Sequence, residues 1–434
     1  MTAELTPPVA VAGVDAIYRK ITWKLIPFLC LCYLAAYLDR INVGLAKLQM
    51  ASQLELSEAA FGLGAGLFFV GYILFEVPSN LILQRVGARL WIARIMISWG
   101  LLSAATMLVT TPMQFYVLRF LLGVAEAGFL PGVLFYLTRW YPSWRRGRMI
   151  SLFMIGLPLS SIIGAPLSGW IMGHFDQHLG LHGWQWMFLL EGLPSVLLGI
   201  LAVWALPESV QQARWLSDDE KDVISEQLWS DKSESGETNH RFRDGFFNLK
   251  VWMLGGIDFS ILLSAYAMGF WLPTFIRNAG VSNVTDIGLL TAIPSIAALF
   301  GMLLISASSD RMRERRWHII VPFIIGAAAM AASTQYSGHL LATMVLFSVA
   351  QAAIIGAVPV FFSLPATFLQ GTAAATGFAL ACSLANIAGL VSNSVMGLAL
   401  DITGSSSGAL WFFAVCLLLS SLLVVALPPK LVNR

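Results

Sequence analysis

Long apolar runs, separated by short polar segments, follow one another along almost the whole chain. A helix that crosses the hydrocarbon core of a bilayer needs about 20 such residues, at roughly 1.5 Å per residue. Twelve runs reach that length, and they cover residues 25–47, 58–82, 90–110, 113–137, 149–173, 185–207, 250–276, 285–308, 317–336, 338–361, 371–397 and 407–427. The pattern predicts an all-α integral membrane protein with twelve transmembrane helices.

The longest polar stretch, residues 208–249, divides the spans into two groups of six. Its charges are mixed, and Ser217 followed by acidic residues is typical of a helix start. We therefore predict an N-terminal six-helix bundle over residues 1–207, a cytoplasmic linker over 208–249 and a C-terminal six-helix bundle over 250–434. Paired six-helix halves are typical of transporters that bind their substrate near mid-membrane, between the halves.

The composition of the 434-residue chain agrees with a membrane protein. Hydrophobic residues make up 57% of the sequence and charged residues 12%, about half of the usual share in soluble domains. The mean hydropathy is +0.75. This composition excludes a soluble enzyme, a secreted disulfide scaffold and a disordered protein. The four cysteines lie in apolar runs, where they indicate core packing rather than a disulfide or zinc framework.

The positions of the basic residues predict the orientation. If the N-terminus is cytoplasmic and the spans alternate, 22 of the 26 lysines and arginines lie on the cytoplasmic side. Lys47 and Arg277 then lie on the outer side, while Arg40 and Arg119 lie inside spans. The positive-inside rule therefore places both termini in the cytoplasm. The first 24 residues are polar and show no secretory signal.

Four charged residues lie inside the first and fourth spans: Asp39 and Arg40, and Arg119 and Glu126. A charge at the bilayer centre costs at least about 2.5–3.5 kcal/mol, so such residues face a cavity and serve a function. Counted along their helices, both arginines lie roughly 21–22 Å above the inner face. Glu126 lies two turns from Arg119 on the same helical face, about 10 Å nearer the cytoplasm. The four charges thus predict one site.

The chemistry of that site suits an organic acid. Each arginine presents a planar fork of donors that matches a carboxylate, so Arg40 and Arg119 are predicted to bind the substrate. Asp39 and Glu126 are the predicted proton carriers, because an anion at the arginines makes proton binding by the carboxyls more favourable. The alternative is that the four charges form two structural ion pairs between the first and fourth spans.

Polar side chains with helical spacing extend the predicted site. Tyr37 precedes Arg40 by three residues, and Tyr72 lies on the second span; tyrosine can donate to a carboxylate. The second half carries no basic residue well inside a span. Its predicted substrate-binding residues are Tyr266 and Asn386, and its other polar candidates are Gln351, Ser383 and Asn393. Interhelical packing is the alternative role for these side chains.

Several short motifs are shared with a known family. The 6+6 plan and the loop SDRMRERR resemble the major facilitator superfamily. Its anion:cation symporter branch is resembled by YLDRIN at 37–42, FEVPSN at 75–80, LRFLLGVAEAGFLPG at 118–132, WYPSWRRGR at 140–148, GWQWMFLLEGLP at 183–194 and FWLPT at 270–274. The resemblance implies proton-coupled uptake of organic anions. It also implies that residues matching Arg40 and Arg119 bind the carboxylate, that those matching Asp39 and Glu126 take protons, and that Tyr37 and Tyr72 line the pocket.

Three positions depart from the hydroxy-acid and sugar-acid members of that branch. This chain has Phe362, Cys382 and Leu157 where those members often have Trp, Asn and Gln. The missing polar contacts predict a cavity less suited to a polyhydroxylated acid and more tolerant of an aromatic or aliphatic one. Tartrate-like acids, sugar acids and aromatic acids such as phthalate all stay open.

Other polar residues near the spans are interpreted mainly as structural. Glu76 and Glu191 lie near predicted span ends, which favours helix capping or loop pairing over proton transfer. Asp258 is not assigned a role. His174, His178 and His182 have a spacing that could hold a metal on a helix, but glycines interrupt the stretch and no metal site is predicted.

Together these features predict a secondary transporter and not an enzyme: a proton-coupled symporter that imports a small organic carboxylate by alternating access. Protons are the coupling ions, and no other cofactor is expected. The expected partners are the organic acid and the lipid bilayer, with no nucleic acid, and the protein is expected to be a monomer in the bacterial inner membrane. The alternative is efflux or antiport of a metabolite or drug on the same fold.

Overall fold

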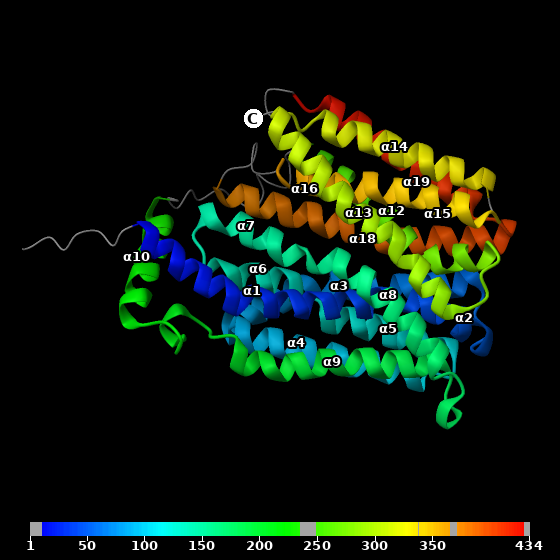
Figure 1. Cartoon of the computed structure of the whole chain (residues 1–434), viewed down its shortest axis with the longest axis horizontal. Helices are drawn as coiled ribbons and strands as arrows, with labels where there is room; N and C mark the ends of the chain where they lie inside the picture. Colours follow the sequence, from blue (N-terminus) through cyan, green and yellow to red (C-terminus); the bar gives the residue numbers. More distant parts are fainter. Residues whose placement is uncertain (1–10, 235–248, 337, 365–370, 429–434) are drawn as a thin grey trace, which may run out of the picture.

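The computed structural model describes residues 11–234, 249–336, 338–364 and 371–428, of which 11–12, 232–234 and 371–384 are described by their backbone alone. The helices of the first half are α1 (Val11–Ile41), α2 (Val43–Gln53), α3 (Glu58–Val86), α4 (Ala88–Ala105), α5 (Pro112–Glu126), α6 (Phe129–Thr138), α7 (Ser143–Met154), α8 (Gly156–His174) and α9 (Gly183–Ala205). After α10 (Asp218–Glu234), the second half holds α12 (Leu249–Asn278), α13 (Val284–Met312), α14 (Trp317–Ser333), α15 (Leu340–Gly356), α16 (Val358–Phe362), α18 (Gly371–Thr403) and α19 (Ser407–Ala426) (Figure 1).

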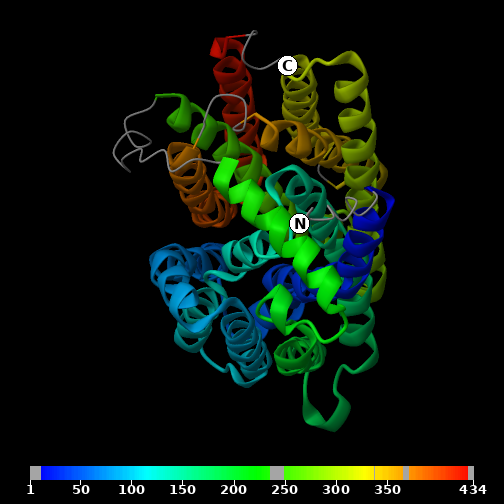
Figure 2. The ribbon, with the colours of Figure 1, turned by 90° about the vertical axis from the view of Figure 1, so that its left-hand side faces the viewer.

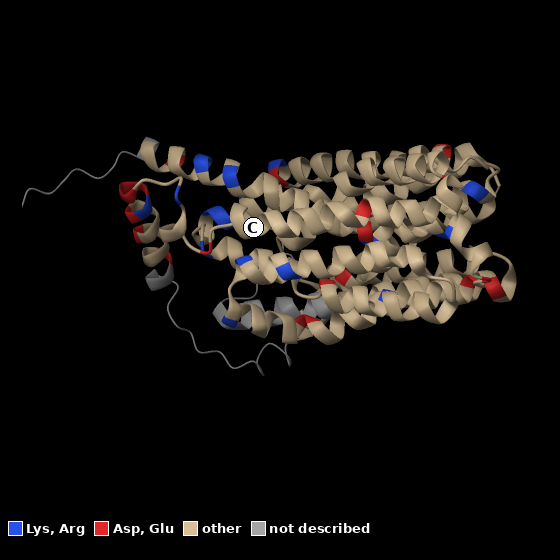
Figure 3. Cartoon of the chain, turned by 90° about the horizontal axis from the view of Figure 1, so that it is seen from below, with Lys and Arg blue, Asp and Glu red and all other residues tan. Residues whose placement is uncertain are grey.

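These helices form twelve segments that are long and apolar enough to cross a membrane. The predicted all-α class and the twelve spans are therefore confirmed. Seen from the end at which α10 lies, the helices form two groups, with the first half of the chain in one and the second half in the other (Figure 2). Lysines and arginines are concentrated at this α10 end, while the opposite end carries α2 (Figures 1 and 3).

The first helix begins earlier than its apolar run. The sequence predicts a span from about residue 25, whereas α1 begins at Val11. The added turns carry polar residues that suit an aqueous surface, and Lys20 Nζ lies 2.7 Å from Glu220 of α10. An apolar run marks only the part of a helix that lipid or protein covers, since the backbone hydrogen bonds of a helix continue regardless of polarity.

The predicted span 113–137 is divided in two. α5 ends at Glu126 and α6 begins at Phe129, because Gly128 adopts a left-handed conformation with φ 88° that favours glycine. The carbonyl of Ala127 at this break accepts a hydrogen bond from Ser79 Oγ at 2.6 Å, which satisfies a polar group inside the bundle. The break places Glu126 at a helix end.

The two halves meet chiefly along two helix pairs, α3 with α18 and α8 with α13. Glycines permit the close approach: a Cβ on Gly169 of α8 would lie 2.8 Å from the carbonyl oxygen of Val284, at the start of α13. At the other pair, Asp401 near the end of α18 accepts from the backbone N–H groups of Glu58 and Ala59, each at 2.9 Å. The contacts therefore involve the start of α3 and the end of α18.

Candidate functional site

The centre of the site is an ion pair between two helices of the first half. Arg40, near the end of α1, donates from Nη2 to Glu126 at the end of α5. The side chain of Glu126 is only 3% exposed. Arg40 Nη1 also lies 3.4 Å from the hydroxyl of Tyr266 on α12. One guanidinium thus joins α1, α5 and the second half of the chain.

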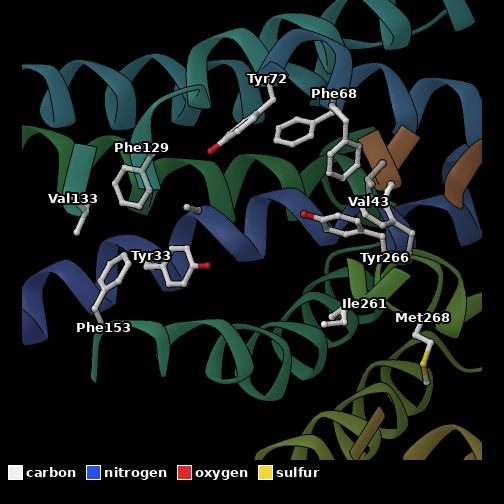
Figure 4. Packing of buried hydrophobic residues seen from close by; sticks show 14 of the residues in the cluster. Tyr33, Val43, Phe68, Tyr72, Phe129, Val133, Phe153, Ile261, Tyr266 and Met268 are labelled. Carbon is white, nitrogen blue, oxygen red and sulfur yellow. The ribbon is translucent and has the colours of Figure 1, made fainter. Parts of the chain in front are cut away.

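Aromatic rings surround Arg40. Its guanidinium carbon lies 5.4 Å from the ring centres of Tyr37 and Tyr72 and 5.1 Å from that of Phe68, distances typical of cation–π contacts. The hydroxyl groups of Tyr33, Tyr72 and Tyr266 point toward the same central region (Figure 4). The structure therefore brings Tyr37, Tyr72 and Tyr266 together around Arg40, as their predicted roles require.

Arg119 contacts one of the rings that also contact Arg40. Its guanidinium carbon is also 5.1 Å from the centre of Phe68, so the two guanidinium carbons are at most about twice that distance apart. Arg119 is 2% exposed, and its Nε and Nη2 have no hydrogen-bond partner within the described residues. A buried cation with unpaired donors is costly, so this group is a strong candidate for binding an anion.

Asp39 faces a different set of residues from its neighbour Arg40. It is 1% exposed and accepts hydrogen bonds from Trp99 Nε1 at 3.0 Å, Ser103 Oγ at 2.8 Å and Ser195 Oγ at 2.7 Å. Consecutive residues on a helix point in different directions, which separates the two side chains. The structure therefore places Asp39 among α1, α4 and α9, outside the group of residues around Arg40.

Three further acidic residues are buried or partly buried. Glu191 lies inside the first half rather than at a span end, and accepts from Ser168 Oγ at 2.6 Å and Asn42 Nδ2 at 3.0 Å. Glu76 follows Tyr72 by one turn of α3, and its buried Oε2 has no partner in the described chain. Asp258, on α12, is 4% exposed. The sequence signal for these residues was a carboxyl group in an apolar run, without any indication of its neighbours.

The polar candidates on α18 have separate surroundings. Asn393 is fully buried; its Oδ1 accepts from Trp271 Nε1 at 3.1 Å and its Nδ2 donates to Gly389 at 2.8 Å. Asn386 is partly buried and makes no hydrogen bond with the rest of the described chain. Cys382 and Ser383 lie outside the residues whose side chains are described. The amide of Asn393 therefore has a structural role, while that of Asn386 is unpaired among the described residues.

The histidine stretch forms aromatic contacts. His174 stacks on Trp170 with ring centres 5.1 Å apart, and His182 Nδ1 lies 2.9 Å from Gln177 Nε2. Within the described ranges, no group of three or more His, Cys, Asp or Glu side chains is placed to hold a metal ion.

A cavity between the halves adjoins the arginine site. It is lined by residues of α1, α8, α12, α13 and α15, among them Tyr37, Tyr266 and Gln351. Leu157, one of the three departures from sugar-acid transporters, also lines it, whereas Phe362 lies on α16 and is 40% exposed. Tyr37 and Tyr266 line the cavity and also contact Arg40, so these two side chains lie between the cavity and the charged site.

Known proteins resemble the chain over nearly its whole length. It is 76% identical to a Pseudomonas putida protein named as a metabolite transport protein, NicT, over 97% of both chains. A protein of Agrobacterium vitis named as a tartrate transporter is 40% identical, over 95% of this chain and 91% of its own. A quinolone resistance transporter of Acinetobacter baumannii is also 40% identical, over 96% of this chain and 95% of its own.

The fold is shared with a solved transporter. The xylose transporter XylE from Escherichia coli, in a partially occluded inward open conformation, superposes with a TM-score of 0.72 over 94% of this chain and 98% of its own, at 14% identity. The family model for the Major Facilitator Superfamily matches residues 29–393. The relatives named as tartrate and metabolite transporters agree with the anion:cation symporter branch that the motifs indicated. The chain belongs to the Major Facilitator Superfamily and is an integral, multi-pass membrane protein.

Proposed function

We propose that this protein is a proton-coupled symporter that imports a small organic carboxylate by alternating access. The observation that carries the proposal is Arg119, a buried guanidinium whose Nε and Nη2 lack a partner among the described residues. It shares the ring of Phe68 with a second arginine, Arg40. A carboxylate placed between the two guanidinium groups would satisfy donors of both through charge-assisted hydrogen bonds. The relative named as a tartrate transporter supports an organic acid as the cargo.

The ion pair between Arg40 and Glu126 supplies the coupling. Glu126 and the substrate carboxylate compete for the same guanidinium, since Arg40 donates to Glu126 in this structure. Protonation of Glu126 removes its charge and frees Arg40 for the substrate. By linkage, the bound substrate then favours the protonated form of Glu126 to the same degree. Proton and anion therefore bind together.

Asp39 is proposed as a second proton carrier. Its carboxyl group accepts three hydrogen bonds from side chains of α4 and α9, and Asp39 directly precedes Arg40 on α1. Neutralising Asp39 would weaken the attachment of α1 to these helices. The resulting shift of α1 would change the position of Arg40 relative to Glu126.

The orientation in the membrane is proposed from the charge distribution, and inward transport from the coupling to protons. By the positive-inside rule, the basic residues concentrated at the α10 end favour an orientation with that end in the cytoplasm of a bacterial cell. The contacts of α3 with α18 and of α8 with α13 then include the outer ends of these helices. Proton co-transport allows accumulation of an anion that the negative membrane potential would otherwise repel. No other cofactor is proposed.

Uptake into proteoliposomes tests the proposal. A panel of radiolabelled carboxylic acids should include at least one acid that accumulates faster when the outside is made more acidic than the lumen. A proton ionophore should reduce this accumulation to equilibration. If the rate of uptake does not depend on the imposed proton gradient, the symport mechanism is wrong. If no carboxylic acid binds, the proposed class of substrate is wrong.

Efflux is the second candidate, because one relative is named as a quinolone resistance transporter. An exporter of this kind should raise the minimal inhibitory concentration of a quinolone when it is expressed in a sensitive strain. Unchanged resistance together with carboxylate uptake would exclude this function for the chain.

A further inference from the structure

Glu191 of α9 is a buried carboxyl group that lies outside the arginine site. It is 4% exposed, and it accepts hydrogen bonds from Ser168 Oγ of α8 at 2.6 Å and from Asn42 Nδ2 at 3.0 Å. Both donors are neutral, and no cation of the described chain forms an ion pair with this carboxyl group. A buried carboxylate without a countercharge is costly, so such a group usually takes up a proton instead.

Asp39 lies about one helical turn from Glu191. Two successive contacts join their helices, since Ser195 donates to Asp39 and Asn42 donates to Glu191. Asp39 and Asn42 are three residues apart and Glu191 and Ser195 are four apart, which separates the carboxyl groups by about 5.4 Å along the helices. Two carboxylates at such a distance repel each other, and the pair retains a proton. Asp39 has three hydrogen-bond donors and Glu191 has two, which favours the proton on Glu191.

The other charged or titratable side chains on the helices around α9 have their own partners or lie at a different depth. The paired or stacked ones are Arg40 of α1 with Glu126, Lys47 of α2 with Glu58, Arg94 of α4 with Trp91, and His174 of α8 with Trp170. Arg89 and Arg94 also lie at least nine residues before Ser103, the residue of α4 that contacts Asp39, which is about 13 Å along the helix. Asp39 is therefore the neighbour that matters most for the charge of Glu191.

A second, smaller cavity between the halves adjoins the two donors of Glu191. Asn42 and Ser168 line it from the first half, and Thr291 of α13 lines it from the second half. Its volume of about 20 Å³ is sufficient for one water molecule. Asn42 Oδ1 is shielded from solvent and has no hydrogen-bond partner among the described residues. This oxygen and the hydroxyl groups of Ser160, Ser168 and Thr291 supply the polar neighbours that a buried water needs.

The packing of α8 on α13 closes this cavity toward the α2 end of the bundle. A Cβ on Gly288 would lie 2.4 Å from the carbonyl oxygen of Ala165, a residue of the cavity lining. Gly169 and the start of α13 at Val284 make a similar close contact nearer that end. Since α8 and α13 belong to different halves, separation of the halves at this end would open the cavity to the outer solution.

We propose that Glu191 is a proton-binding residue, and that it exchanges its proton with the outer solution through this cavity. The inference rests on the proposed function in one respect, because it assigns Glu191 a share in the coupling of protons to transport. A hydronium ion in the cavity gives a proton to Ser168 Oγ while the hydroxyl proton of Ser168 passes to Glu191 Oε1. Water and an unchanged serine remain. A hydroxyl group can carry out this relay because it both donates and accepts.

Infrared difference spectroscopy of the purified full-length protein tests the proton without any substrate. At pH 7 the wild type should show the C=O stretch of a protonated carboxyl group that is lost in Glu191→Gln. Ser168→Ala removes one donor to this group and should shift the same band to higher frequency, which decides the question even if Glu191→Gln folds poorly. The control is Ser98→Ala on α4, whose hydroxyl donates to the carbonyl of Ile95 and which should leave the band unchanged.

Transfer of the protein into D2O measures access to the proton. The band should exchange more slowly in Ser168→Ala than in the wild type and in Ser98→Ala, because the relay lacks its hydroxyl group. Equal exchange rates would overturn the route through Ser168. If Glu191→Gln removes no carboxyl band and Ser168→Ala shifts none, Glu191 is ionised and the proton site is wrong.

Transport measurements separate this inference from the proposed function. In proteoliposomes, Glu191→Gln should retain counterflow of the substrate and lose its accumulation on an imposed proton gradient. Accumulation equal to that of the wild type would overturn the share of Glu191 in coupling, while the carboxylate site and the symport mechanism would stand. If the wild type takes up no carboxylic acid, the proposed function fails, and the infrared bands still decide whether Glu191 holds a proton.

Discussion

Arg40 and Arg119 come from different helices, yet each places its guanidinium carbon 5.1 Å from the centre of the same ring, that of Phe68. Only Arg40 has a carboxylate partner, Glu126, while Nε and Nη2 of Arg119 are unpaired within the described chain. The two cations therefore differ in availability. In the proposed mechanism Arg119 can bind an anion directly, whereas Arg40 can bind one only after Glu126 releases it.

The first prediction concerns this difference. Arg119→Ala should weaken carboxylate binding at least about 30-fold, because a buried charged partner is worth roughly 2–5 kcal/mol to a bound anion. Arg119→Lys should not restore it, since an ammonium cannot form the two parallel hydrogen bonds of a guanidinium. Ligand-induced thermal shift of the purified protein measures both effects. The exposed Lys24→Ala is a control that should bind normally, and substrate binding by Arg119→Ala would contradict the assigned role.

A second prediction separates binding from coupling. Glu126→Gln mimics the protonated carboxyl and leaves Arg40 available, so this variant should bind substrate and catalyse counterflow. It should not accumulate substrate on an imposed proton gradient. Both activities can be measured in the same proteoliposomes, with Glu226→Gln on the exposed face of α10 as the matched control. If Glu126→Gln still concentrates substrate, the coupling proton binds elsewhere, and Asp39 becomes the first residue to test.

A third prediction concerns the contact between the halves at the start of α3. Asp401 accepts hydrogen bonds from the backbone N–H groups of Glu58 and Ala59. It thereby caps the N-terminus of α3, a helix of the other half. Asp401→Asn should weaken this contact by roughly 1–2 kcal/mol, because a carboxylate at a helix N-terminus is favoured over an amide.

Spin labels on Gln53 and Thr403 can report that change. Double electron–electron resonance should show a larger fraction of long distances in Asp401→Asn than in the wild type. Asp286→Asn, which alters an exposed carboxylate at the start of α13, should leave the distribution unchanged. An unaltered distribution in Asp401→Asn would show that the helix contacts close this end without the aspartate.

The fourth prediction is a pH dependence of the docking of α10. The hydrogen bond from Lys20, together with a backbone bond from Ser217, lowers the pKa of Glu220 below its usual value. A carboxyl with a lowered pKa in the docked state stabilises that state above its ordinary pKa, and this contribution is lost as the pH falls. Docking of α10 on α1 should therefore weaken below about pH 4.

Two variants of Glu220 separate its roles. Glu220 accepts from the backbone of Ser217 at 2.8 Å, while Ser217 Oγ accepts from Glu220 at 3.2 Å, which is the reciprocal capping of a helix start. Glu220→Gln keeps this capping and loses the charge, whereas Glu220→Ala loses both. Hydrogen exchange should show undocking with intact α10 in the first variant and fraying of α10 in the second. Equal protection factors for α10 at pH 7 and pH 3.5 in the wild type, corrected for the pH dependence of intrinsic amide exchange, would contradict the role of the ion pair.

The sequence alone determined the spans, because the thickness of the bilayer fixes the length of an apolar helix. It also identified Arg40, Arg119 and Glu126 as exceptional, because charges in lipid are too costly to be retained without a function. The start of α10 was predictable too, since the capping residues are neighbours in the chain.

The tertiary structure decided which of these residues meet. Helical spacing gives the depth of a residue, but the rotation and tilt of packed helices decide which side chains face one another. For this reason Asp39 lies among Trp99, Ser103 and Ser195 although it adjoins Arg40 in sequence. The cavity likewise arises only where five helices from both halves converge, and Oε1 of Gln351, which has no partner within the described residues, belongs to its lining. Local sequence patterns determine where helices form, and the packing of helices that are distant in sequence determines which polar side chains meet.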